Sequence, residues 1–166
     1  MSYTTNLDLV RKANMYGLPL VAVLSKDDLP PTPKDGYYII NLEDEVSSSG
    51  MRNDGSHWVG CGIDNGKAVY WDSYGVSPPV EVQRFLAKYI PYQYATKMVQ
   101  SPRSGWCGMY QLFFIAFMTR QRGKQPDIHK RFQCFLSLWS NDYDDNLTRL
   151  KKYIKPFSLW KGGSAP

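Results

Sequence analysis

The chain has 166 residues, of which 43 % are hydrophobic and 14 % aromatic, and its formal net charge is +5. This length and composition are typical of one packed domain and exclude a disordered or low-complexity chain. Three cysteines without paired spacing disfavour a disulfide framework, and the first residues lack a secretory signal pattern. The longest apolar run, 112–118, is far shorter than the ~20 residues of a membrane span. We therefore expect one intracellular domain over residues 1–160, followed by a flexible tail over 161–166.

The first part of the chain predicts one helix followed by short strands. Residues 6–16 have apolar side chains three and four positions apart, with Thr5 or Asn6 as the cap and Gly17 as the terminator. Two apolar runs and a polar run rich in Ser and Gly follow, which predict strands over 20–24 and 37–42 and a loop over 43–56.

A β-hairpin is predicted next, because Asn65-Gly66 lies between two apolar runs and is typical of a two-residue type I′ turn. This turn fixes the register and pairs Val59 with Asp72. His57 then lies diagonal to Asp72 on the same face, where backbones are about 7 to 8 Å apart. The hairpin therefore places a carboxylate within hydrogen-bonding reach of an imidazole, as the orienting acid of a catalytic triad requires.

The rest of the chain is predicted to be helical. Apolar periodicity, proline at helix starts and glycine at helix ends indicate helices over 79–89, 109–122, 128–139 and 142–155, the last ending at Pro156. Strands early and helices late indicate an α+β domain, with helices packed on a small mixed or antiparallel sheet.

Cys107 follows a polar loop and opens the helix predicted over 109–122, so it lies at a helix N-terminus that stabilises a thiolate. Its backbone N–H and the Gln100 amide are suited to an oxyanion hole. Taken singly, His57, Asp72 and Gln100 also have plain structural interpretations, but together with Cys107 they indicate a thiol protease. The three cysteines and two histidines do not have the spacing of zinc ligands, which disfavours a zinc site.

Basic residues gather in two places, and a solvated surface is the plainer interpretation of both, with a DNA-binding face as the alternative. The first cluster contains Arg120, Arg122, Lys124, Lys130 and Arg131, and the second, near the C-terminus, contains Lys151, Lys152, Lys155 and Lys161.

Four segments carry a resemblance to a known family: Gly55-Ser56-His57-Trp58-Val59, Tyr70-Trp71-Asp72-Ser73-Tyr74-Gly75, Val99-Gln100-Ser101-Pro102 and Trp106-Cys107-Gly108. Over about residues 7–118 the chain resembles the adenovirus-type endopeptidases, or adenains, and their relatives in virophages and polinton-like viruses. It is also similar to the SUMO-specific proteases, a related group with the same permuted papain-like core. Asp72 departs from the Glu that adenains often have there and agrees with the SUMO-specific group.

The resemblance implies site roles and a reaction. His57 is the general base and acid, Asp72 orients it, Cys107 attacks, and Gln100 helps to bind the oxyanion. Both groups cleave after Gly-Gly, and Trp58 and Trp106 are expected to wall a slot too narrow for side chains, with core packing as the alternative for both.

The expected function is a monomeric viral maturation protease that processes capsid or core precursors in the infected cell and in the virion. No cofactor is required for the chemistry, but the resemblance implies stimulation by DNA and by a short viral peptide. The alternatives are an isopeptidase for ubiquitin-like modifiers and a non-enzymatic binding module. The end of the chain, Gly162-Gly163-Ser164, resembles a cleavage site for the protease itself, with a flexible tail as the plainer interpretation.

Overall fold

A mixed sheet of five strands forms the centre of the molecule in a computed structural model that describes residues 5–43, 57–102 and 104–158. The strand order is β1-β2-β3-β4-β5, with parallel pairs at both edges and antiparallel pairs between them. The strands are β1 (Leu20–Ser25), β2 (Gly36–Asn41), β3 (Trp58–Asp64), β4 (Lys67–Trp71) and β5 (Gln93–Tyr94). This arrangement confirms the predicted α+β class.

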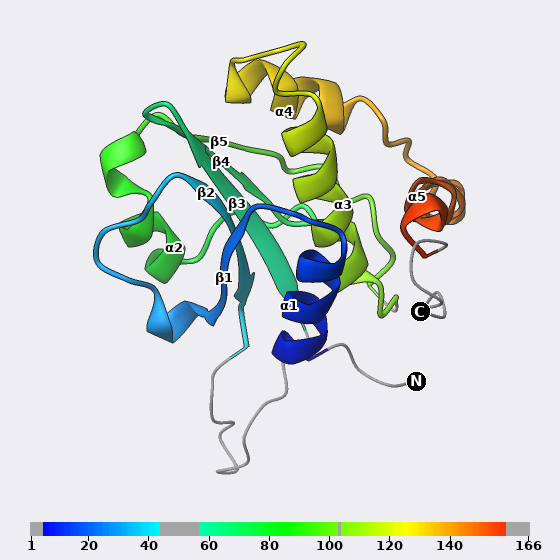
Figure 1. The fold of residues 1–166 in the computed structure, drawn as a ribbon, viewed down its shortest axis with the longest axis horizontal. Coiled ribbons are helices and arrows are strands. Elements are labelled where there is room, and N and C mark those ends of the chain that lie inside the picture. Colours follow the sequence, from blue (N-terminus) through cyan, green and yellow to red (C-terminus); the bar gives the residue numbers. More distant parts are fainter. Residues whose placement is uncertain (1–4, 44–56, 103, 159–166) are drawn as a thin grey trace.

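Helices cover both faces of the sheet (Figure 1). The α-helices are α1 (Asn6–Met15), α2 (Val80–Phe85), α3 (Cys107–Arg120), α4 (Ile128–Leu136) and α5 (Tyr143–Ser158), and the 3-10 helices are η1 (Lys26–Asp28) and η2 (Ala87–Tyr89). Helix α2 lies on one face and α1 and α3 on the other. Alternate strand residues therefore enter two separate cores, as Trp71 and Tyr70 illustrate.

The predicted hairpin is confirmed in its turn and in most of its register. Asn65 and Gly66 both have positive φ, 51° and 76°, as a type I′ turn requires. The ladder runs from Asp64–Lys67 to Gly60–Trp71, and the expected pair of Val59 with Asp72 is not formed. The strands end at this point, so His57 and Asp72 lie just beyond the ends of β3 and β4.

Two glycines in β3 leave room for side chains that pack closely against this strand. A Cβ on Gly60 would overlap the Gln111 side chain of α3, and a Cβ on Gly62 would lie 2.5 Å from the Tyr37 ring. Helix α3 is consequently buried on nearly all sides, which explains why its sequence is apolar all round.

Several predicted boundaries were wrong. The helix over 79–89 is split into α2 and η2, α3 begins at Cys107 instead of Met109, α4 ends at Leu136, and β5 was not predicted. Helix α5 continues past Pro156 to Ser158. A proline inside a helix cannot donate to the carbonyl four residues earlier, and here that carbonyl belongs to Lys152, an exposed residue that water can reach.

A buried arginine fastens the turn end of the hairpin to α4. The Arg131 side chain is fully buried and donates to Asp64 Oδ2 at 3.0 Å and to the carbonyl oxygens of Gln125 and Pro126 at 2.9 and 2.8 Å. Arg122, which is exposed, donates to both oxygens of the same carboxylate at 3.0 Å. Arg131 is therefore an internal residue and does not belong to the basic surface that the sequence indicated.

The two arginines on Asp64 provide a matched test of burial. Arg131→Met should lower the free energy of unfolding by about 3–5 kcal/mol, because it removes one partner of a buried charge pair and three hydrogen bonds. Arg122→Met, whose side chain is 66 % exposed, should lower the free energy of unfolding far less, because solvent screens this ion pair. Urea unfolding of both variants checks this, and equal losses would contradict it.

Candidate active site

His57 and Asp72 meet at the open end of the hairpin. His57 Nε2 lies 3.0 Å from Asp72 Oδ1, and the Asp72 carboxylate is 1 % exposed. The same oxygen accepts the backbone N–H of Tyr74 at 2.8 Å, which fixes the carboxylate. Because an ionised carboxylate only accepts hydrogen bonds, Nε2 carries a hydrogen and the ring orientation is set.

Cys107 is the first residue of α3 and lies against the other side of the imidazole. Its side chain is close enough to interact with His57, and this interaction raises the pKa of the imidazole. Among the described residues, His57 Nδ1 has no nitrogen or oxygen partner and is buried, so it is the ring nitrogen left to exchange a proton with the thiol. The three predicted side chains are therefore brought together in the order Cys107, His57, Asp72.

These contacts determine the charge of His57. Burial opposes protonation of the ring, but the hydrogen bonds to Asp72 and Cys107 outweigh it and raise the pKa of His57 to about 9. The imidazole is consequently protonated at neutral pH. A cationic ring beside a thiol at a helix N-terminus favours a thiolate–imidazolium pair, the reactive form of a cysteine nucleophile.

Gln100 is buried beside this pair, and its amide is fixed at both ends. The Ser73 hydroxyl donates to Gln100 Oε1 at 2.5 Å, and Gln100 Nε2 donates to the Ser104 carbonyl at 2.9 Å. An amide nitrogen has two hydrogens, so this bond leaves one for another acceptor. That hydrogen and the Cys107 N–H at the start of α3 are the two donors that the sequence predicts for an oxyanion hole.

Tyr74 is a site residue that the sequence did not single out. Its ring stacks on His57 with centroids 4.4 Å apart and planes 20° from parallel. Its hydroxyl donates to the Ser104 carbonyl at 3.2 Å, the same oxygen that Gln100 binds. Tyr74 thus connects the imidazole to the loop that leads to Cys107. An aromatic residue two positions after the acid was the only sequence signal for it.

The turn from Asp72 to Gly75 organises these contacts. Gly75 has φ 72°, and a Cβ there would lie 2.5 Å from the Thr96 carbonyl oxygen, so glycine is required. The close approach lets the Ser73 carbonyl accept the backbone N–H groups of Val99 and Gln100 at 2.9 and 3.1 Å. Three successive residues therefore orient the base, the amide and the loop before the nucleophile.

The two tryptophans of the expected slot differ in their surroundings. Trp58 is 1 % exposed and belongs to the core on the α3 side, which agrees with the packing alternative. Trp106 is half-buried beside Cys107, and Lys151 Nζ of α5 lies 5.0 Å from its ring centre. Trp106 remains the candidate for a substrate contact.

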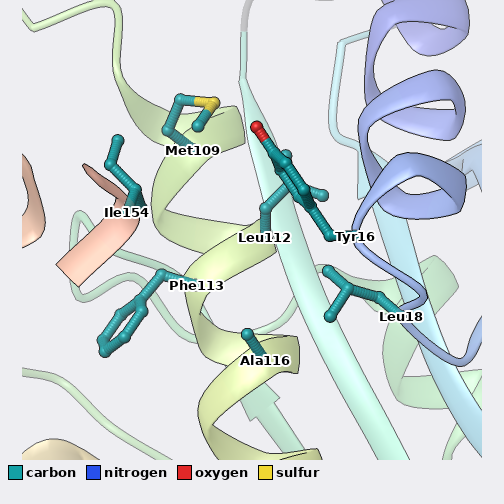
Figure 2. Close-up of a pocket in the computed structure, with 7 residues that line it drawn as sticks. All are labelled: Tyr16, Leu18, Met109, Leu112, Phe113, Ala116 and Ile154. Carbon is teal, nitrogen blue, oxygen red and sulfur yellow. The ribbon is translucent and has the colours of Figure 1, made fainter. Parts of the chain in front are cut away.

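A small apolar pocket lies away from these residues, between α1, α3 and α5 (Figure 2). Its lining is apolar apart from the Tyr16 hydroxyl: Tyr16, Leu18, Met109, Leu112, Phe113, Ala116 and Ile154. None of the predicted catalytic residues, His57, Asp72, Gln100 and Cys107, lines it, so it is a gap in helix packing.

In the described parts of the chain, no group of three or more His, Cys, Asp or Glu side chains is arranged to hold a metal ion. Nor does any helix there have the length and apolar character to cross a membrane.

The site can be compared with known families. A model described as the Ulp1 protease family, C-terminal catalytic domain, matches residues 50–151, more than half of the chain. The chain belongs to the Ulp1 protease family. It is therefore a cysteine protease catalytic domain, and the predicted enzyme class is confirmed. A search of curated proteins found no match.

The charge of His57 predicts how stability depends on pH. The folded pKa of His57, about 9, exceeds the ordinary histidine pKa of 6.5, so protonated His57 stabilises the fold fully below pH 6.5. This contribution is lost as the pH rises through 9. The advantage of the wild type over His57→Gln in unfolding free energy should therefore shrink by about 1–3 kcal/mol across this range. Urea unfolding at several pH values measures it. The same decrease in an Asp72→Asn background would contradict the assigned cause.

Proposed function

We propose that this Ulp1-family domain is an endopeptidase that cleaves after Gly-Gly-type sites to mature viral capsid or core precursors. Cys107 is the proposed nucleophile, His57 the acid and base, Asp72 the orienting group and Gln100 an oxyanion donor. The observation that carries the proposal is the placement of His57 between Asp72 Oδ1 and the Cys107 side chain.

The reaction follows from this placement. The Cys107 thiolate attacks the scissile carbonyl carbon, and the oxyanion accepts the Cys107 N–H and the second hydrogen of Gln100 Nε2. His57 Nδ1 gives its proton to the leaving nitrogen as the C–N bond breaks, which leaves a thioester and a neutral imidazole. The imidazole then takes a proton from water as the water oxygen attacks the thioester carbon. The thiolate leaves, the acid product departs, and the imidazolium is restored.

The viral substrate class is supported by the resemblance of the His57, Asp72 and Cys107 segments to adenain. A second candidate, an isopeptidase for ubiquitin-like modifiers, is favoured by the match to the Ulp1 family and by Asp72 in place of Glu. Both candidates use the same chemistry. They differ in whether the substrate is recognised as an extended peptide or through a folded modifier.

DNA and a short peptide are proposed activators. The net charge of +5 supports DNA binding, as do the exposed Lys151 and Lys152 on α5. For a peptide held by a disulfide, the exposed Cys134 is the better partner. Cys61 is buried, and burial raises its pKa to about 12, which suppresses the thiolate needed for exchange.

One experiment separates these alternatives. The wild type and Cys107→Ala are given a peptide with an internal Leu-Arg-Gly-Gly site and a ubiquitin-like modifier fused through the same site, each with and without DNA. We expect cleavage of the peptide by the wild type alone, and DNA stimulation that falls steeply with salt. Cleavage of the modifier fusion only would favour the isopeptidase. Equal cleavage by Cys107→Ala would contradict the thiol mechanism. Stimulation by DNA that does not change with salt concentration would contradict electrostatic activation by DNA.

The oxyanion role of Gln100 predicts a graded kinetic series. Gln100→Ala should lower kcat by about 100- to 1,000-fold, because one donor to the oxyanion is lost. Ser73→Ala should lower kcat by about tenfold at similar KM, since the amide loses the bond that orients it. Gln83→Ala is the matched control, because the side chain of this exposed glutamine donates to the Pro78 carbonyl at 2.9 Å. Wild-type kcat in Gln100→Ala would exclude the amide from the oxyanion hole.

Self-cleavage after Gly163 concerns residues outside the described part of the chain and stays a prediction. The wild type should lose Ser164-Ala165-Pro166 while Cys107→Ala keeps its full mass. Intact-mass measurement tests this, and equal full masses would contradict it.

A further inference from the structure

A glutamine with no place in the reaction lies in the core directly behind the nucleophile. Gln111 is on α3, one helical turn after Cys107, and its side chain is fully buried. Its neighbours along the helix, from Leu112 to Ala116, are all apolar. Because a buried amide is costly unless it is hydrogen-bonded, its contacts are informative.

These contacts lead to the two strand ends that carry the base and the acid. Gln111 Nε2 donates to the carbonyl oxygen of Trp71 at 3.1 Å and, more weakly, to that of Trp58 at 3.5 Å. Trp58 directly follows His57, and Trp71 directly precedes Asp72. Both acceptors are carbonyls, so the nitrogen end of the amide must face them. One side chain from the nucleophile's helix therefore contacts both strands beside the triad.

The opposing strand has space for this side chain. Gly60 lies where its Cβ would overlap Gln111 Oε1 and approach the Phe114 ring to 3.1 Å. The β3–β4 ladder ends at the pair of Gly60 with Trp71, beside the carbonyls that Gln111 binds. Gly60 and Gln111 are thus complementary in shape at the point where the ladder ends.

We propose that Gln111 is a positioning residue that sets the distance from Cys107 at the start of α3 to His57 and Asp72 at the ends of β3 and β4. The inference rests on the proposed catalytic roles of these three residues. Its physical basis is that a rigid helix transmits the position of one turn to the next, and that misplacement by about 1 Å can lower a rate 100-fold. A side chain that only fills the core would affect stability alone.

The test measures the Cys107–His57 pair without a peptide substrate. Alkylation of Cys107 by iodoacetamide is followed by mass spectrometry between pH 5 and 9 in a Cys134→Ser background, which removes the exposed thiol. At pH 6 the wild type should react at least tenfold faster than His57→Ala, because the imidazolium maintains the thiolate. Equal rates at that pH would overturn the proposed function and the inference with it.

Two variants address Gln111 itself. Gln111→Met keeps the size of the side chain but cannot donate, and Gly60→Ala places a methyl group where the amide oxygen lies. Both should lower the alkylation rate at pH 6 by about 10- to 100-fold, and they should lower kcat for the peptide with little change in KM. Gly60→Ala alone decides the test if Gln111→Met does not fold.

Ile115→Ala is the control, because it removes buried atoms from the same helix and leaves the Gln111 amide in the chain. It should lower Tm yet keep the alkylation rate within twofold of the wild type. Wild-type rates in Gln111→Met and Gly60→Ala would overturn the inference while leaving the thiol mechanism intact. An equal fall in Ile115→Ala would also overturn it, since general loosening of α3 would then explain the effect.

Discussion

The close packing of α3 against β3 is the constraint on which the site depends. The nucleophile belongs to the helix, whereas the base and the acid belong to the hairpin, so catalysis requires two elements far apart in sequence to meet at a fixed distance. Gly60 removes the side chain that would hold them apart. The buried face of α3 then supplies the hydrophobic free energy that keeps them together.

The electrostatic contacts at the site favour the same arrangement of helix and hairpin as this packing does. Asp72 is deprived of solvent and fixed by the backbone N–H of Tyr74, so its charge acts mainly on His57. The ring is also covered by Tyr74, which limits water on one of its faces. A cation sustained in this way lies next to the positive end of the α3 dipole, and a thiolate between them neutralises both. The arrangement therefore places two positive electrostatic contributions beside the proposed nucleophile.

The parts of the site that were predictable from the sequence depend on local rules. An Asn-Gly turn fixes the hairpin register, and a polar loop followed by an apolar run places Cys107 at a helix start. Ser73 as the orienting partner of Gln100, Tyr74 as the cover of His57, and Gln111 as a contact between helix and strands were all missed. Each acts on a residue 17 or more positions away, through packing that no local pattern encodes. Arg131 was misassigned to the surface for the same reason, because its acceptors are brought together only in the fold.

The attachment of Asp64 to α4 has a consequence for how the molecule opens. Asp64 ends β3 at the turn, and Trp58 begins it beside the site, so the hairpin is attached to α4 through Arg131 at one end and to α3 through Gln111 at the other. A strand pair held at both ends cannot fray from either one. Amide hydrogens in β3 and β4 should therefore exchange only when the whole domain unfolds. The strand ends that support His57 and Asp72 then belong to the last cooperative unit to open, and this support persists until the fold itself is lost.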